Sequence, residues 1–473
     1  MKTYLVKSLC ICLLSLVGFS SSVFAQNKVV PQNKAEVQFS YAPLVKKTAP
    51  AVVNVFTSKT VQARTNTPLF NDPFFQRFFG DRLQRSAPGP KRKVQNSLGS
   101  GVLIGEHGII VTNNHVIAGA EEIKVVLSDR REFPATLIGT DKRTDIAVLK
   151  IDTEGESLPY LKLSDPDALE IGDLVLAIGN PFGVGQTVTS GIVSAMARTN
   201  IGVSDLNSFI QTDAAINPGN SGGALVDMNG RLIGVNTAIF SKSGGSNGIG
   251  FAIPVNMVSH VVKSLLSSGD VVRPWLGASG QNVTSKIAQA LGMKRPIGIM
   301  VTSLHELGTA KRAGLKVGDV LLEINGYELH EVQDLKFRIA TQTVGDTAKV
   351  TVMRRGGKVV LDMVLEAPPE IPQKNETLLR GRHPFSGAVV ANLSPALSDQ
   401  LGRPHEDTGV ILLKLERAQN AARLGLKSGD IVLKVNGEAV KNVRHLQHLI
   451  DASPEGWVVV MDRGGREIKL VVR

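Results

Sequence analysis

The pentapeptide Gly219-Asn220-Ser221-Gly222-Gly223 carries more information about this chain than any other stretch of its sequence. A serine between glycines has little side-chain crowding, so the backbone can bend sharply and present Oγ outward. In such a bend the amides of Gly219 and Ser221 can converge on one point, as an oxyanion hole requires. Gly219, Asn220 and Ser221 are therefore the candidate oxyanion hole, and Ser221 is the candidate nucleophile. Short Gly/Ser clusters are also common in ordinary loops, so the assignment depends on residues upstream.

A serine nucleophile needs a general base, and three of the nine histidines lie in the first 270 residues. His107 lies between glycines in a segment typical of an exposed turn. His260 lies in an apolar helical pattern, where we expect its side chain to face solvent. His115 instead follows the apolar strand 109–112 and opens a short turn, a corner from which it can reach a neighbouring element. We therefore predict His115 as the base.

Two aspartates compete for the acid that orients this histidine. Asp145 directly precedes the apolar strand 146–151, so its side chain can be held at the edge of a barrel. Asp141 lies four residues away in the preceding turn, where a turn-capping role is the simpler interpretation. We take Asp145, which completes a triad of His115, Asp145 and Ser221.

These three residues, in this order and with these neighbours, resemble the chymotrypsin-like serine proteases and, more narrowly, the HtrA family. The matching segments span most of residues 99–257 and are Gly99–Val102, Thr112–Val116, Thr144–Lys150, Ile216–Leu225, Asn236–Ile239 and Gly248–Pro254. The resemblance implies a mainly β chain whose protease domain, about residues 36–268, is a chymotrypsin-like double β-barrel. Its two six-stranded antiparallel barrels would hold the triad in the cleft between them.

The resemblance also implies a wall of the specificity pocket at Thr237, Ala238, Ile239, Phe240 and Ser241. This segment offers apolar surface with no acid at its base, so we expect small or medium aliphatic residues before the scissile bond.

Asn220 separates this chain from the digestive serine proteases, which commonly place there an aspartate that pairs with a newly cut N-terminal amine. A neutral amide cannot make that ion pair, so we do not expect activation by zymogen cleavage. The resemblance implies instead that loops around the site rearrange when substrate or an accessory domain engages.

An internal repeat follows the protease domain. Residues 313–326 recur, 111 residues later, as 424–437, and each copy has a Gly-Asp turn, a period-two strand and an Asn-Gly turn signal. The pattern resembles the PDZ domain in the form that follows HtrA proteases, and two copies place it with the DegP/DegQ branch. We expect PDZ domains over 272–367 and 382–473, joined by a stiff, Pro-rich linker over 368–381.

PDZ domains bind an extended peptide as an added strand and hold its terminal carboxylate on backbone amides. In the first copy the loop Trp275-Leu276-Gly277-Ala278 fits this role, and we expect it to bind peptides with apolar C-termini. In the second copy, Phe385-Ser386-Gly387-Ala388, Ser386 replaces a large apolar residue, so peptide binding there stays open. The alternative for both modules is that they only hold neighbouring subunits together.

Residues 1–25 have the pattern of a secretory signal peptide. Two lysines precede an apolar stretch of eleven residues, 9–19, which is too short to span a bilayer, and Ala25 ends a plausible cleavage site. The two cysteines of the chain, Cys10 and Cys12, would leave with the signal, so the mature chain needs no disulfide. With the HtrA-like body, this predicts a periplasmic protein.

The net charge of +11 does not indicate a nucleic-acid-binding protein, because the basic residues are spread out and no basic stripe is interleaved with aromatics. Weak contact with acidic lipid surfaces or acidic unfolded chains fits this charge better. No nucleotide-binding glycine loop appears in the sequence, so no energy source for active unfolding is visible. We expect no cofactor and no metal.

Residues 60–95 form a long segment without strand alternation, which is unusual inside a compact domain unless the loop is functional or disordered. Five of the sixteen phenylalanines cluster there: Phe70, Phe74, Phe75, Phe78 and Phe79. One interpretation is a short helix packed on its own barrel. The family resemblance implies an inter-subunit loop that covers the active site of a facing trimer, which we favour, so we expect homotrimers and larger trimer-based assemblies.

The sequence thus predicts an ATP-independent serine endopeptidase that degrades unfolded or misfolded periplasmic proteins by acyl-enzyme chemistry, with PDZ domains that bind peptides and regulate cleavage. The alternative is a chaperone that holds such proteins, alone or alongside proteolysis. Natural substrates, the size of the oligomer and the activation temperature do not follow from the sequence.

Overall fold

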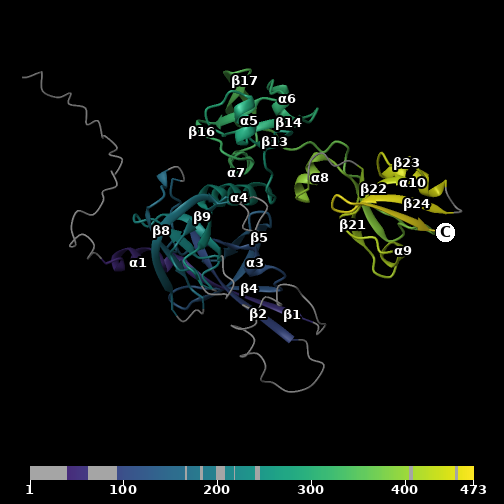
Figure 1. The fold of residues 1–473 in the computed structure, drawn as a ribbon. Helices are drawn as coiled ribbons and strands as arrows, with labels where there is room; N and C mark the ends of the chain where they lie inside the picture. Colours follow the sequence, from purple (N-terminus) through teal and green to yellow (C-terminus); the bar gives the residue numbers. More distant parts are fainter. Residues whose placement is uncertain are drawn as a thin grey trace, which may run out of the picture. The chain divides into compact units, whose positions relative to one another are not determined.

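The structure is a computed structural model, shown in Figure 1, that describes residues 40–61, 93–165, 168–181, 185–198, 208–217, 219–239, 246–403, 409–452 and 456–472. The predicted signal peptide and the phenylalanine cluster of the predicted inter-subunit loop lie outside the described residues.

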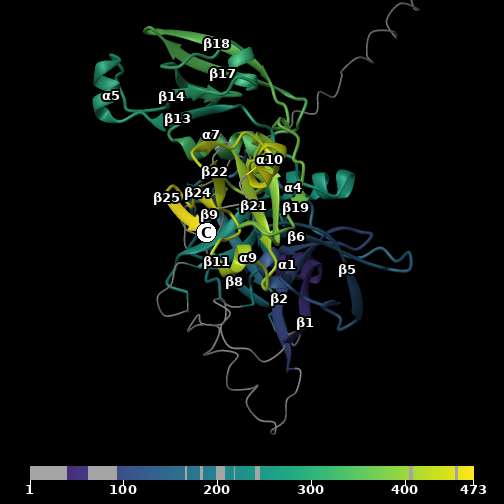
Figure 2. The same cartoon turned by 90° about the vertical axis from the view of Figure 1, so that its right-hand side faces the viewer.

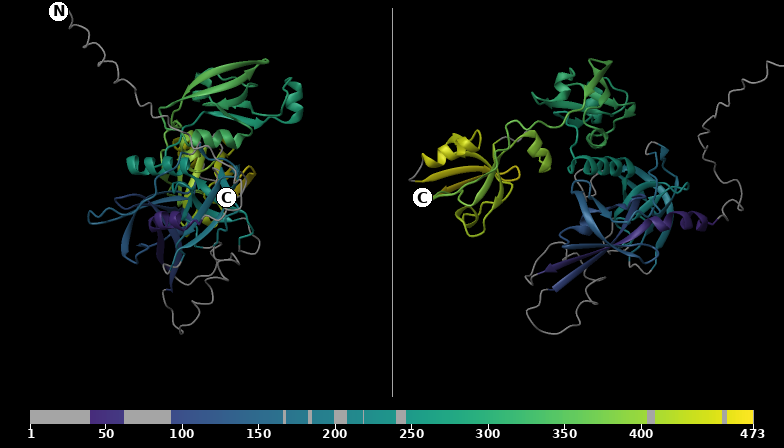
Figure 3. Two further views of the ribbon diagram at one scale, coloured as in Figure 1. Left: turned by 90° about the vertical axis from the view of Figure 1, so that its left-hand side faces the viewer. Right: turned by 180° about the vertical axis from the view of Figure 1, so that it is seen from behind.

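The first part of the protease region is a closed barrel with the strand order β1-β2-β3-β6-β5-β4. Its strands are β1 (Val52–Val61), β2 (Lys93–Gly105), β3 (Ile109–Asn113), β4 (Glu122–Val126), β5 (Glu132–Asp141) and β6 (Ile146–Ile151). Helix α1 (Ala42–Thr48) and the 3-10 turn η2 (Ala49–Ala51) precede it, and the one-turn helix α3 (Asn114–Ile117) follows β3. Strands β1 and β2 pair over ten successive positions, and this long ribbon is visible in Figure 3.

A second closed barrel follows, with the order β10-β11-β12-β9-β8-β7. Its strands are β7 (Leu174–Gly179), β8 (Thr187–Arg198), β9 (Phe209–Thr212), β10 (Ala224–Val226), β11 (Leu232–Ile239) and β12 (Gly250–Pro254). Both barrels are six-stranded and antiparallel, so the predicted double-barrel fold is confirmed.

Helix α4 (Val255–Ser268) follows the second barrel and ends where Gly269 adopts a left-handed conformation, with φ of 79°. Its apolar residues, including Val258, Val261 and Leu265, are buried in the core that also contains residues of both barrels. His260 is buried too, at 9% exposure, so the expectation that it faces solvent was wrong. The apolar stripe of α4 is wide enough to include position 260 on its inner side.

The first PDZ domain is a six-stranded sheet of order β13-β14-β15-β17-β18, with β16 paired to β15. Its strands are β13 (Ala278–Asn282), β14 (Ile299–Leu304), β15 (Val320–Ile324), β16 (Tyr327–Glu328), β17 (Thr347–Arg354) and β18 (Gly357–Val364). Its helices are α5 (Ser285–Ala290), α6 (Thr309–Arg312) and α7 (Val332–Ala340). The long β17–β18 hairpin stands out in Figure 2.

The second PDZ domain has seven strands in the order β19-β20-β21-β22-β24-β25, with β23 paired to β22. Its strands are β19 (Thr377–Leu378), β20 (Ala388–Asn392), β21 (Val410–Leu415), β22 (Ile431–Val435), β23 (Glu438–Ala439), β24 (Trp457–Asp462) and β25 (Glu467–Val472). Its helices are α8 (Pro395–Gln400), α9 (Asn420–Arg423) and α10 (Val443–Asp451).

The predicted Asn-Gly turns occupy equivalent places in the two PDZ domains. Asn325 and Gly326 follow β15 with φ of 49° and 85°, and Asn436 and Gly437 follow β22 with the same values. Two successive positive φ values are typical of a type I′ hairpin turn, for which Asn-Gly is the preferred pair. The predicted linker over 368–381 is corrected by the structure, because β19 lies inside it and pairs with β20.

Candidate active site

Ser221 lies in the loop that leads into β10 of the second barrel. Gly219 and Gly222, on either side of it, have φ of 92° and 84°, which favours glycine. A Cβ atom on Gly219 would overlap Pro181, and one on Gly222 would overlap the backbone of Ser100. The glycines that first marked this stretch are therefore required by its backbone conformation and by its close contacts.

Ser100 on β2 of the first barrel holds this loop in place. Its backbone N–H donates to the carbonyl of Ser221 at 2.8 Å, and its hydroxyl donates to the carbonyl of Gly219 at 2.6 Å. The same hydroxyl accepts a hydrogen bond from the amide of Asn180 at 2.7 Å. Ser100 of the first barrel thus fixes two carbonyls of the loop that leads into the second barrel.

The amides of the predicted oxyanion hole differ from one another. The amide of Asn220 donates to the carbonyl of Asn217 at 3.0 Å, within the turn. Those of Gly219 and Ser221 have no partner among the residues that the structure describes. Two of the three predicted residues therefore have amides available for a substrate oxygen, while Asn220 shapes the turn between them.

His115 and Asp145 meet at one edge of the first barrel, His115 on α3 and Asp145 directly before β6. The Nδ1 atom of His115 lies 2.6 Å from Oδ2 of Asp145, and the backbone N–H of His115 donates to Oδ1 at 2.9 Å. Asp145 has φ of 60°, and its carbonyl accepts from the amide of Asn114 at 3.0 Å and from the side chain of Asn113 at 3.1 Å. These hydrogen bonds hold Asp145, a non-glycine residue, in the left-handed region.

The two side chains differ in exposure. The imidazole of His115 is 37% exposed, whereas the carboxylate of Asp145 is 7% exposed. A buried acid that fixes one ring nitrogen, with the ring itself open to solvent, is the arrangement expected for a general base and its orienting group.

Thr237 on β11 connects the acid to the nucleophile. Its hydroxyl donates to Oδ2 of Asp145 at 2.9 Å, and its backbone carbonyl accepts the hydroxyl of Ser221 at 3.1 Å. Among the described residues, no hydrogen bond links Ser221 to His115. The sequence placed Thr237 only in the pocket wall, and its bond to the acid was missed because nothing in the spacing of 92 residues pairs the two positions.

The other predicted pocket residues are less fully described. Ala238 and Ile239 continue β11 beyond Thr237, whereas Phe240 and Ser241 lie outside the described residues.

The residues that competed with His115 and Asp145 for the roles of base and acid have other surroundings. The side chain of His107 is 75% exposed at the turn between β2 and β3. Asp141 accepts a hydrogen bond from the amide of Arg143 at 3.3 Å and another from the hydroxyl of Thr144, as expected of a turn-capping residue, and it also pairs with the buried Arg273. Burial lowers the pKa of His260, and the positive charge of Arg273 lowers it further.

The predicted carboxylate loop of the first PDZ domain has two backbone amides with no partner among the described residues. The carbonyls of Leu276 and Gly277 accept hydrogen bonds from the amides of Ala310 at 3.0 Å and His305 at 2.7 Å. Their own amides have no partner in the described part of the chain. Gly277 has φ of 66°, and a Cβ there would overlap the backbone of Gly308.

The described residues contain neither a cluster suited to a metal ion nor a helix suited to span a membrane. No group of three or more His, Cys, Asp or Glu side chains among them is placed to hold a metal ion. Within the same residues, no helix has the length and apolar character needed to cross a membrane.

Comparison with known proteins agrees with this architecture. Residues 99–235 match the trypsin-like peptidase domain, and residues 274–365 and 415–462 match PDZ domains. The periplasmic serine endoproteases DegP of Salmonella typhimurium and Escherichia coli strain K12 are each 38% identical to the chain over 455 residues, with 92% of both chains covered. Among solved structures, the HtrA-type protease AlgW with a decapeptide is 47% identical, covers 70% of this chain and 99% of its own, and has a TM-score of 0.52.

Proposed function

The chain belongs to the DegP-like HtrA serine endoproteases, and we propose that it cleaves unfolded periplasmic proteins without ATP, through an acyl-enzyme formed on Ser221. Relatives at 38% identity over 92% of the chain, and the trypsin-like peptidase domain followed by two PDZ domains, show this membership.

The observation that carries this proposal is the hydrogen-bonded connection from His115 through Asp145 and Thr237 to Ser221. Asp145 binds the Nδ1–H of His115, which leaves Nε2 as the atom that can take a proton. Rotation of the Ser221 side chain from the Thr237 carbonyl toward Nε2 would exchange one hydrogen bond for another. Such tightening in the presence of substrate is common in active sites.

With the hydroxyl so turned, Oγ of Ser221 attacks the scissile carbonyl while His115 takes its proton. The negative charge that develops on the carbonyl oxygen is stabilised by the free amides of Gly219 and Ser221. His115 then gives the proton to the leaving amine, which breaks the peptide bond and leaves an ester on Ser221. Water, deprotonated by His115, hydrolyses that ester and restores the hydroxyl.

We propose that the first PDZ domain binds substrate or activating peptides with apolar C-termini. Its edge strand β13 offers backbone groups for an added strand, and the free amides of Leu276 and Gly277 can hold the terminal carboxylate. We also propose cleavage of the N-terminal signal at Ala25, a periplasmic location, and assembly from trimers. The mass of the purified protein, measured alone and with an unfolded substrate, tests the assembly.

The test of the proteolytic role is digestion of casein by the purified protein, with and without a serine-directed phosphonate inhibitor. We expect digestion that stops when the inhibitor is present, and an intact-mass shift of one adduct located on Ser221 by peptide mapping. Digestion that continues after full labelling, or an adduct on another residue, would contradict the proposed chemistry.

A holding function has one specific observation in its favour. The hydroxyl of Ser221 is directed at the Thr237 carbonyl, so the resting site is not set for attack. A protein in this state can retain an unfolded chain at its first PDZ domain without cutting it. Ser221→Ala protein that still suppresses aggregation of a denatured substrate would support this second role, and loss of suppression would remove it.

A further inference from the structure

The two PDZ domains differ at one edge of their sheets. Strand β13 pairs with β14 on one edge, and in the described part of the chain its other edge has no partner strand. Strand β20, its counterpart, pairs with β21 and also with β19. Val390 of β20 faces both Leu412 and Thr377, and one residue cannot have two partners on the same edge. Strand β19 therefore covers the edge that is open in the first PDZ domain.

The segment Lys374–Leu379 runs antiparallel along this edge. The amide of Leu379 donates to the carbonyl of Ala388 at 2.9 Å, and the carbonyl of Leu379 accepts from the amide of Gly387 at 2.8 Å. Further along, the amide of Asn392 donates to the carbonyl of Lys374 at 2.8 Å. An extended peptide that adds to a sheet edge exchanges backbone hydrogen bonds in this manner.

The side chain of Leu379 is also placed like a side chain of a bound peptide. It is 3% exposed and belongs to the apolar core of the second PDZ domain, together with Leu446 and Ile450 of α10. Burial of this apolar side chain stabilises the segment on the sheet edge. In a terminal-peptide complex, this is the place of the last side chain.

The backbone hydrogen bonds of the two carboxylate loops agree on the carbonyl side and differ on the amide side. The carbonyls of Ser386 and Gly387 accept from Ala421 at 3.1 Å and Glu416 at 2.8 Å, which repeats the arrangement at Leu276 and Gly277.

Their amides, however, are occupied. The amide of Ser386 donates to the carbonyl of His383 at 3.2 Å, and that of Gly387 to the carbonyl of Leu379. The carbonyl of Leu379 thus stands where a peptide carboxylate would accept.

We propose that Lys374–Leu379 is a built-in ligand of the second PDZ domain, which therefore takes no terminal peptide from outside. This goes beyond the proposed proteolysis and assigns terminal-peptide capture to the first PDZ domain alone. The segment is tethered through only the five residues 380–384, and a short linker gives an effective concentration on the order of millimolar. A free peptide at micromolar concentration does not compete with it.

The first test is a cross-link in full-length protein whose Cys10 and Cys12 are replaced by serine. Leu378 and Val389 are register partners with half-buried side chains. Opposed residues in an antiparallel pair have Cα atoms about 4.5–5.5 Å apart, within the range that a disulfide spans. We expect Leu378→Cys/Val389→Cys to oxidise readily, and the control Leu378→Cys/Val390→Cys, shifted by one residue to the opposite face, to stay reduced.

The second test counts peptides. A fluorescent heptapeptide ending in valine with a free carboxylate is titrated into the same variants, with Ser221→Ala added to prevent cleavage. We expect one peptide per chain, before and after oxidation of the Leu378→Cys/Val389→Cys protein. Two peptides per chain that fall to one on oxidation would overturn the proposal, as would equal cross-linking of both cysteine pairs. If no peptide binds at all, the proposal for the first PDZ domain fails, and the cross-linking result still decides this one.

Discussion

Thr237 is the residue on which both sides of the candidate active site depend, because its hydroxyl serves Asp145 and its carbonyl holds Ser221. Thr237→Val keeps the shape and the carbonyl but removes the donor to a buried carboxylate. A hydrogen bond to a charged group contributes about 1.5–3 kcal/mol, so we expect kcat/KM to fall roughly 10- to 100-fold.

The matched control is Thr237→Ser, which keeps the hydroxyl and should retain most of the activity. For both variants, kcat and KM are measured on a fluorogenic peptide with an aliphatic residue before the scissile bond. A valine variant as active as the serine variant would show that the donor to Asp145 has no part in the reaction.

Ser221→Ala should abolish peptide-bond hydrolysis, with a loss on the order of 10⁴-fold or more in kcat. His115→Ala should lose a similar amount, and the double variant little more, because the two residues act as one unit. Casein cleavage by pure Ser221→Ala protein near the rate of the parent would exclude Ser221 as the nucleophile.

His260 makes the stability of the protease domain depend on pH. Its folded pKa is lowered from 6.5, first by burial and then by the charge of Arg273. Between the folded and unfolded pKa values, unfolding takes up a proton, so the free energy of unfolding falls as the pH falls. The stabilisation is present above about pH 6.5 and is lost as the pH drops through the folded pKa.

We therefore expect His260→Gln to reduce the fall in Tm between pH 7.5 and 5.5. The control is His107→Gln, whose side chain is 75% exposed in the parent and should leave the slope unchanged. Equal slopes in all three proteins would mean that other groups set the pH dependence.

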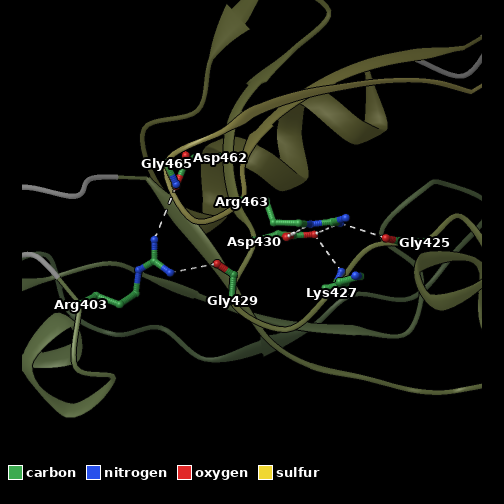
Figure 4. A network of polar contacts seen from close by, with 8 residues as sticks. All are labelled: Arg403, Gly425, Lys427, Gly429, Asp430, Asp462, Arg463 and Gly465. Atoms are coloured by element: carbon green, nitrogen blue, oxygen red, sulfur yellow. Dashed lines mark hydrogen bonds and ion pairs between the residues drawn. The ribbon is translucent and has the colours of Figure 1, made fainter. Parts of the chain in front are cut away.

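At the scale of elements, both PDZ domains contain an aspartate–arginine ion pair that joins the Gly-Asp turn to the last β-hairpin. We call this ion pair the latch. In the second domain, shown in Figure 4, the guanidinium of Arg463 donates twice to Asp430, both at 2.7 Å, and once to the carbonyl of Gly425 at 2.9 Å. The amide of Lys427 also donates to Asp430 at 2.8 Å.

In the first domain Asp319 and Arg354 make the same contacts. Burial there would raise the pKa of Asp319, but hydrogen bonds from Arg354 and from the amide of Lys316 lower it overall. The recurrence of this latch in both repeats indicates that it fixes the Gly-Asp turn that opens β15 and β22.

Asp430→Asn should therefore lower the free energy of unfolding of the second PDZ domain by about 1–3 kcal/mol, because donors of a partly buried guanidinium lose their charged acceptor. Asp462→Asn is the control. Its carboxylate has longer contacts, 3.6 Å to Arg403 and 3.4 Å to the amide of Gly465 (Figure 4), so we expect a smaller change. Urea unfolding monitored at Trp457 checks both, and equal effects would argue against a specific latch.

How far the sequence predicts this molecule depends on the range of the interaction. The internal repeat and its Asn-Gly turns followed from local patterns, whereas the double barrel and the PDZ fold followed from the resemblance to the HtrA family; all of these are confirmed by the fold. Strand β19 did not, because Thr377 and Leu378 lie in a polar stretch after prolines and acquire their structure only by pairing with β20. The same holds for Thr237 and for the burial of His260, which depend on elements distant in sequence.

At the scale of the whole molecule, the question is whether peptide binding at a PDZ domain changes cleavage at the protease site. Coupling between two such sites is typically about 1–3 kcal/mol, or roughly 5- to 150-fold. We expect peptides with an apolar C-terminus and a free carboxylate to accelerate cleavage of a separate reporter within this range. Amidated versions should not, because they lack the charge that the loop amides bind.

Which PDZ domain carries the response can be resolved with one substitution in each carboxylate loop. Gly277 has φ of 66° and Gly387 has φ of 83°, so alanine strains both loops. Within the described residues, the amides of the first loop have no partner and those of the second loop are occupied, so Gly277→Ala should remove the acceleration and Gly387→Ala should keep it. Deleting residues 272–473 should also remove it while basal cleavage persists. Equal acceleration of the truncated and full-length proteins would exclude regulation by either PDZ domain, whereas a loss in Gly387→Ala alone would move the regulatory site to the second.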